Sequence, residues 1–66
     1  MLKYTYKNNK FPKKQYDCFE DNYDLGARFY VYEKLDGNAS QKLYMSKAQF
    51  ENFELVLKTN GWSATT

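Results

Sequence analysis

The side chains of this sequence that could do chemistry are carboxylates, one thiol and many tyrosines. Histidine is absent, so Cys18 and the serines lack a base that titrates near neutral pH. The carboxylate pairs Asp21 with Asp24 and Glu51 with Glu54 could in principle do acid–base work, but the second pair is expected on the exposed side of a helix. The sequence has no glycine-rich phosphate loop and no metal-ligand spacing. We therefore expect a non-enzymatic protein without a metal or cofactor.

The length indicates a single domain, residues 1–66. A chain of this size buries only about 60% of its unfolded surface, so its stability is marginal. Cys18 is the only cysteine, which excludes a disulfide within the chain. Seven Tyr, five Phe and one Trp must therefore supply most of the core. Pairing of two copies would bury more surface, which favours a homodimer.

Charge is divided unevenly along the chain, although the net charge is only +2. The first segment is basic, with Lys3, Lys7, Lys10, Lys13 and Lys14 and no acid among residues 3–14. The next is acidic, with Asp17, Glu20, Asp21 and Asp24 and no base among residues 17–24. Two solvated loops that attract each other explain this pattern, and so does a dipolar surface that steers a partner. We expect a cytoplasmic protein, since no signal peptide or membrane-spanning apolar run is visible.

Alternating apolar and polar residues predict three antiparallel strands. They lie near residues 2–7, 27–34 and 41–45, with a hairpin from 27 to 45 that turns at Asp36-Gly37-Asn38. Residues 8–25 are expected to form a loop that can include a short edge strand near Gln15 to Phe19, because Phe11-Pro12 disfavours a central strand. Residues 63–66 are expected to be a frayed tail.

A helix over residues 47–60 is predicted by signals at both ends. Ser46 and Gln49 form a capping box sequence, and Gly61 supplies the left-handed residue that ends the helix, with Trp62 placed to contact Leu57. The apolar stripe expected to face the sheet is Phe50, Phe53, Val56 and Leu57. Leu55 lies off this stripe and is expected to be exposed. The predicted fold is α+β: a three-stranded antiparallel sheet with one C-terminal amphipathic helix on one face.

The predicted sheet has two different faces. Phe29, Val31, Leu43 and Met45 are expected under the helix. The opposite face carries Tyr30, Tyr32 and Tyr44 with Arg28 and Lys34. This face can bind a partner, form an oligomer or stack single-stranded nucleic acid, or it can be covered by residues 8–25 through Phe11, Tyr16 and Phe19.

One segment resembles a known family. Residues 26–34, with a glycine, paired aromatics, a Tyr-x-Tyr rhythm and a lysine, are similar to a strand of the small phage-encoded uracil-DNA glycosylase inhibitors. The Phe50-Glu51 or Phe53-Glu54 pair in the following helix, and Tyr16-Asp17 upstream, also have counterparts, so the resemblance covers about residues 16–57. The chain departs from this acidic family in its net charge of +2, in a longer turn after Lys34 and in having no predicted strand after the helix.

The resemblance implies a homodimer, acting in the host cytoplasm, that blocks the DNA-binding cleft of a host repair enzyme. The helix phenylalanines would enclose an apolar side chain of the enzyme, and the neighbouring glutamate would imitate a phosphate. The residues expected to bind the partner are Phe50, Glu51, Phe53, Glu54, Leu55, Asp17, Glu20, Asp21 and Asp24. Two alternatives remain: a single-strand nucleic-acid-binding module that uses the tyrosines and the Lys3–Lys14 cluster, and an oligomeric structural protein.

Overall fold

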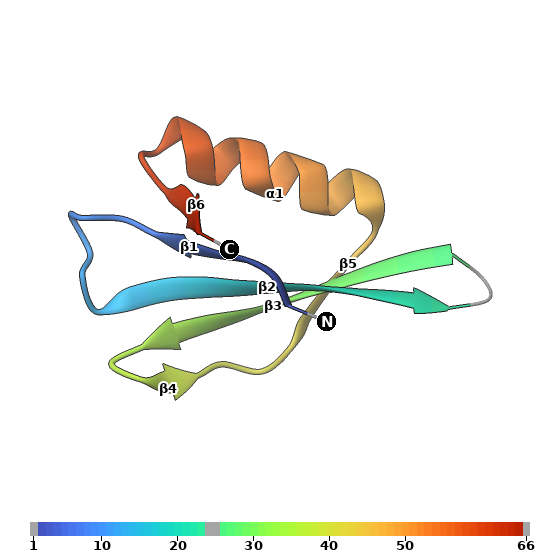
Figure 1. The fold of residues 1–66 in the computed structure, drawn as a ribbon, viewed down its shortest axis with the longest axis horizontal. Coiled ribbons are helices and arrows are strands. Elements are labelled where there is room, and N and C mark those ends of the chain that lie inside the picture. Colours follow the sequence, from blue (N-terminus) through green and yellow to red (C-terminus); the bar gives the residue numbers. More distant parts are fainter. Residues whose placement is uncertain (1, 24–25, 66) are drawn as a thin grey trace.

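A computed structural model describes residues 2–23 and 26–65, and within these ranges it describes only the backbone of residues 22–23 and 26–27. It is an α+β fold with a six-stranded sheet and one helix in this part of the chain (Figure 1). The elements are β1 (Leu2–Lys7), β2 (Lys14–Tyr23), β3 (Gly26–Leu35), β4 (Asn38–Ala39), β5 (Leu43–Met45), α1 (Lys47–Thr59) and β6 (Ser63–Thr65). No helix of the described residues is long and apolar enough to cross a membrane.

The sheet is antiparallel throughout its described pairs, in the order β4-β3-β2-β1-β6. The strand β5 pairs with β3 along the same edge as β4, but nearer the start of β3, at Phe29 to Val31. The turn between β3 and β4 places Asp36 and Gly37 at positive φ of 53° and 82°, the combination that two-residue hairpin turns require. The predicted hairpin is therefore confirmed, and the predicted count of three strands is too low.

The largest correction concerns residues 8–25, which were expected to form a loop. Residues 14–23 are the strand β2, which lies in the middle of the sheet between β1 and β3. Pro12 does not interrupt β2, because it lies in the preceding turn, where Lys14 N donates to Phe11 O at 3.1 Å. Residues 24 and 25 of the predicted turn lie outside the described residues.

The segment after the helix is also ordered by pairing, although it was predicted to be a tail. The strand β6 pairs with β1, with Thr5 opposite Thr65 and Lys7 opposite Ser63. The Thr65 side chain donates to Thr5 O at 3.0 Å. A strand does follow the helix, so that departure from the inhibitor family was wrongly expected.

The helix α1 confirms the predicted end signals. Gln49 N donates to the Ser46 hydroxyl at 3.2 Å, and Ser46 N donates to the Gln49 side chain at 2.9 Å. At the other end, Gly61 has φ of 88°, and Trp62 N donates to Leu57 O at 2.9 Å, as in a Schellman motif. These local bonds satisfy backbone groups that a helix end would otherwise leave unpaired.

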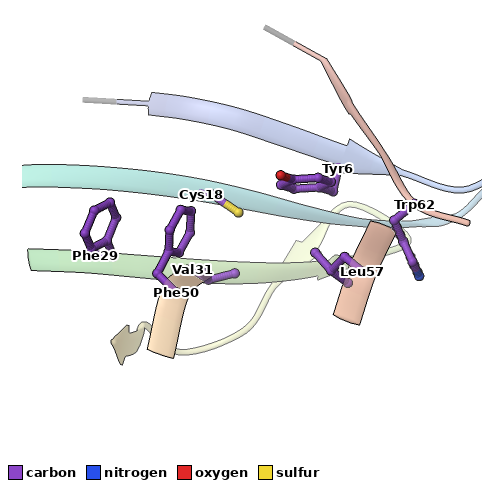
Figure 2. Packing of buried hydrophobic residues seen from close by; sticks show 7 residues of the cluster. All are labelled: Tyr6, Cys18, Phe29, Val31, Phe50, Leu57 and Trp62. Atoms are coloured by element: carbon purple, nitrogen blue, oxygen red, sulfur yellow. The ribbon is translucent and has the colours of Figure 1, made fainter. Parts of the chain in front are cut away.

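The core lies between α1 and the face of the sheet that α1 covers (Figure 2). Phe29 and Phe50 stack there with ring centroids 4.5 Å apart. The buried apolar side chains are Tyr6, Cys18, Phe29, Val31, Phe50, Leu57 and Trp62. Val56 and Leu43 were expected in this core but are exposed. The helix buries a narrower stripe than predicted, and Leu43 lies on the short outer strand β5.

Candidate binding site

Strand pairing brings four aromatic side chains together on the sheet face opposite α1. Phe19 on β2 is the register partner of Tyr30 on β3, and Tyr30 is also the partner of Tyr44 on β5. Tyr32 lies two residues further along β3 and therefore projects to the same side as Tyr30. We call Phe19, Tyr30, Tyr32 and Tyr44 the tyrosine face.

The rings of the tyrosine face pack on one another. Phe19 and Tyr30 are stacked with centroids 4.9 Å apart and planes 3° apart. Tyr32 meets both of them edge-on, at 5.7 Å from Phe19 and 5.9 Å from Tyr30. Tyr44 lies 6.1 Å from Tyr30 with the planes tilted by 51°. Three of the rings, Phe19, Tyr30 and Tyr32, are half-buried in this packing.

Tyr44 is the most open ring of the four, with 62% of its surface exposed. Figure 1 shows α1 on one side of the sheet, and no other helix of residues 2–23 and 26–65 covers the tyrosine face. The sequence alternative in which residues 8–25 cover this face is wrong, because β2 lies within the sheet beside β3. Only Phe19 joins the face, whereas Tyr16 packs on Phe53 and Trp62 on the helix side.

Two cationic side chains border the tyrosine face, and two acids of β2, Asp17 and Asp21, lie on the same side as the register partners of Tyr32 and Arg28. The Lys42 ammonium lies 4.9 Å from the centroid of the Tyr30 ring, within cation–π range. The nearby Tyr32 and Tyr44 hydroxyls raise the pKa of Lys42, which stays protonated at neutral pH. Arg28 precedes Tyr30 by two residues on β3 and is exposed on the same side. Cations are therefore placed beside open aromatic surface.

Asp17 is used inside the fold and is not an exposed member of an acidic loop. Its side chain is 9% exposed and accepts from Lys34 at 2.8 Å, Gln15 at 2.9 Å and Thr5 at 3.1 Å. Burial raises the pKa of the Asp17 carboxyl, but the bonds from Lys34, Gln15 and Thr5 outweigh burial, and the net shift is downward. The carboxylate joins three strands, which is a structural role.

The other acids of this segment are dispersed by the strand. Glu20 and Asp21 follow each other on β2 and so project to opposite faces of the sheet. Both have partners within the protein. Asp24 lies outside the described residues. The described part of the acidic loop expected to bind a partner, residues 17–23, is therefore strand, and Glu20 lies on the other face from Asp17 and Asp21.

Three of the helix residues expected to bind a partner are directed inward. Phe50 is 1% exposed and belongs to the core. Phe53 is half-buried against Tyr16, with ring centroids 5.5 Å apart. Glu54 accepts a hydrogen bond from the Tyr6 hydroxyl across the helix–sheet interface. Burial, and then the Glu54 carboxylate, raise the pKa of Tyr6, so the tyrosine remains a donor at every physiological pH.

The Tyr6–Glu54 bond predicts a measurable stability effect. Replacing Tyr6 by phenylalanine keeps the ring in the core but leaves the half-buried Glu54 carboxylate without this donor. Hydrogen bonds to charged groups contribute about 1.5–3 kcal/mol, so the free energy of unfolding should fall by about that amount in urea titrations. The matched control is Tyr44→Phe on the exposed face, which should change it by less than about 0.5 kcal/mol. Equal effects of the two substitutions would contradict the bond's role.

Two of the predicted helix residues do lie at the surface. Leu55 is 62% exposed, as expected, and Glu51 is exposed one turn before it. The remaining candidate, Cys18, is fully buried. Burial, with Glu54 and Asp17 nearby, raises the pKa of its thiol to about 12, so it is not a nucleophile at neutral pH.

Arg28, Tyr30, Tyr32 and Tyr44 were predicted from the sequence to share this face, but two further members of the site were not. Phe19 was assigned to a covering loop, and Lys42 was not singled out. The alternation of Tyr16 and Cys18 with Asp17 and Phe19 was the signal that could have placed Phe19 on the same face as the tyrosines.

Within the described residues, no group of three or more His, Cys, Asp or Glu side chains could hold a metal ion. Comparison with protein-family models, with curated proteins and with solved structures found no match to this chain.

Proposed function

We propose that this protein is a non-catalytic binding protein that holds single-stranded nucleic acid on its tyrosine face. The observation that carries the proposal is the gathering of Phe19, Tyr30, Tyr32 and Tyr44 on the sheet face that α1 leaves open, with Lys42 against Tyr30. Proteins that bind single strands without sequence preference combine aromatic stacking surfaces with cations that follow the phosphates.

The geometry assigns different roles to the four rings. Tyr44 has the largest open surface and is the ring on which a base stacks. The packed rings of Phe19, Tyr30 and Tyr32 support the Tyr44 ring, and their own exposed edges face the bound nucleic acid. Lys42 and Arg28, which flank this surface, bind the phosphates. Sequence preference is expected to be weak, because every base has a face that can stack.

The test is fluorescence anisotropy of a labelled 12-nucleotide single strand at low salt. Tyr44→Ala should weaken binding by about 5- to 150-fold, since one stacked base contributes about 1–3 kcal/mol. The matched control is Leu55→Ala, because Leu55 is exposed to the same extent, 62%, but lies on the helix. It should bind like the unaltered protein.

Two outcomes would overturn this proposal. One is the absence of binding by the unaltered protein at low salt. The other is a stable dimer, seen by mass measurement in solution, that Tyr44→Ala dissociates while strand binding is absent. The second outcome would identify the tyrosine face as an oligomer interface.

Inhibition of a host uracil-DNA glycosylase by a phage-encoded homodimer is the second candidate. The observation that favours it is the exposed pair Glu51 and Leu55, one turn apart on the outer side of α1, where a carboxylate borders an apolar side chain. A glycosylase assay should then titrate to zero activity near one or two copies of this chain per enzyme, and Leu55→Ala should weaken inhibition. Full glycosylase activity at micromolar excess would remove this candidate.

A further inference from the structure

A second aromatic surface lies at the turn between β1 and β2, away from the tyrosine face. The Phe11 ring stacks on Trp62, with centroids 6.1 Å apart and planes 9° apart. Trp62 is buried and meets Tyr16 edge-on at 5.0 Å, so it is fixed to the core. Phe11 itself is 52% exposed. One side of the Phe11 ring is therefore supported by the protein, and much of the rest faces solvent.

The backbone around Phe11 is held in place before any ligand binds. Phe11 N donates to Asn8 O at 3.0 Å, and Pro12 restricts the conformation of Phe11. Asn8 is buried, and its side chain donates to Asn60 O at 3.1 Å and accepts from Lys10 N at 3.0 Å. These bonds tie the turn to the end of α1, so little order would have to be gained on binding.

Three lysines lie on the segments that carry Phe11 and Trp62. Lys10 and Lys13 precede and follow the Phe11-Pro12 pair, and Lys58 lies in the last turn of α1, which leads to Trp62. One acid pairs with this group: the Asp36 carboxylate lies 3.9 Å from the Lys13 ammonium. Both of these side chains are largely exposed, and such a pair is weak, so Lys13 remains available to another anion.

We infer that Phe11, with Lys10, Lys13 and Lys58, is a second binding point for the single strand proposed to bind the tyrosine face, on which this inference rests. Along β3, the chain runs from Tyr30 to Leu35 and then to Asp36, whose N–H donates to Lys13 O at 2.9 Å. The distance from Tyr30 to Asp36 is about 20 Å at the rise of a strand. A single strand of nucleic acid stacked at about 3.4 Å per nucleotide needs about six nucleotides to span this length. It needs further nucleotides to pass round the end of the sheet to Phe11, which stacks on Trp62 on the helix side.

A single strand of nucleic acid is the anion that fits this surface best. The Phe11 ring lies parallel to Trp62, so a base can continue the stack on the outer side. A ring that anchors a protein in a membrane instead projects into the lipid, and a stacked ring cannot do so without leaving Trp62. Anionic phospholipid vesicles therefore serve as the competing ligand in the test.

The first measurement is the affinity for the 12-nucleotide strand. Phe11→Ala should weaken it by about 5- to 150-fold, while Leu55→Ala leaves it unchanged. The double substitution Lys10→Gln with Lys13→Gln should lower the slope of log affinity against log salt by about 1.4, or about 0.7 for each phosphate that is no longer neutralised. Lys47→Gln, at the opposite end of α1, is the charge control and should leave the slope unchanged.

The second measurement uses Trp62, the only tryptophan, as an internal reporter. A saturating unlabelled strand should change its emission in the unaltered protein and in Tyr44→Ala. Urea unfolding of Phe11→Ala, followed by circular dichroism, establishes whether that variant is folded. If Phe11→Ala is unfolded, the lysine substitutions and the Trp62 emission still show whether the strand contacts this second binding point.

The outcomes separate this inference from the proposed function. If the strand binds and Tyr44→Ala weakens binding, but the salt slope of the lysine variant and the Trp62 emission do not change, only the second binding point is wrong. If no strand binds, both proposals are wrong. Vesicle binding that depends on Phe11, with no strand binding, would instead identify a membrane-binding surface.

Discussion

Phe50→Ala is expected to remove a large part of the free energy of unfolding of the protein. Phe50 is 1% exposed and stacks on Phe29 at 4.5 Å in the centre of the core. Truncation of such a ring costs about 3–5 kcal/mol. A chain of 66 residues has a free energy of unfolding of only about 3–10 kcal/mol. Circular dichroism and urea titration should show a lower midpoint or no folded baseline.

The control for this experiment is Leu55→Ala on the same helix. Leu55 is 62% exposed, so its truncation should change the free energy of unfolding by less than about 0.5 kcal/mol. The comparison also bears on the version of the inhibitor hypothesis in which Phe50-Glu51 is the binding pair, which needs the Phe50 ring at the surface. A Phe50→Ala variant as stable as Leu55→Ala would contradict the core described above.

Asp17→Asn is expected to destabilise the protein at neutral pH and to remove part of its acid sensitivity. The asparagine keeps the shape of the side chain but loses the charge that Lys34 pairs with at 2.8 Å. Breaking a buried pair costs about 3–5 kcal/mol, and the partial exposure of Lys34 reduces this to about 2 kcal/mol.

The sign of the pH effect follows from the lowered pKa of Asp17. A carboxylate whose pKa is lower in the folded state stabilises the fold fully above its unfolded pKa, which is about 3.9. This contribution is lost as the pH falls through the folded pKa. The unaltered protein should therefore lose more stability than Asp17→Asn below about pH 4.

Urea midpoints at pH 7 and pH 3 measure this difference. Asp36→Asn is the control, because Asp36 is largely exposed and its pair with Lys13 is long, at 3.9 Å. Its acid sensitivity should match that of the unaltered protein. Parallel pH curves for Asp17→Asn and the unaltered protein would show that the Asp17 network does not stabilise the fold.

The helix could be predicted from the sequence because its end signals are local. Ser46 and Gln49 are three residues apart, and Gly61 and Trp62 follow the last turn directly, so the bonds they form do not depend on the rest of the fold. The hairpin of β3 and β4 could be predicted for the same reason, since the positive φ angles at Asp36 and Gly37 depend only on neighbouring residues.

The strands β2 and β6 could not be predicted in the same way. The strand β6 is three exposed residues long and exists only because β1 offers an edge. In β2, charged residues alternate irregularly with aromatic ones, and the burial of Asp17 depends on Lys34 and Thr5 from neighbouring strands. Such pairings are set by the fold as a whole, which local propensity does not describe.

In the candidate site, too, the features set by local sequence could be predicted and those set by the whole fold could not. The side of the sheet on which Tyr30, Tyr32 and Tyr44 lie followed from alternation within predicted strands. Alternation could have placed Phe19 on this face, but its position opposite Tyr30 required the register between β2 and β3. The stack of Phe11 on Trp62 joins the two ends of the sequence. Phe50, Phe53 and Glu54 were wrongly expected to bind a partner, because Phe-Glu pairs look alike whether the ring points inward or outward.

The pairing of β1 with β6 has a kinetic consequence. Thr5 and Thr65 are 60 residues apart in sequence, so this pair forms only after a very long loop has closed. Until then, one side of β1 has unpaired backbone groups, the kind of edge that recruits strands from other molecules. Refolding at high protein concentration is therefore a competition between closure by β6 and aggregation along β1.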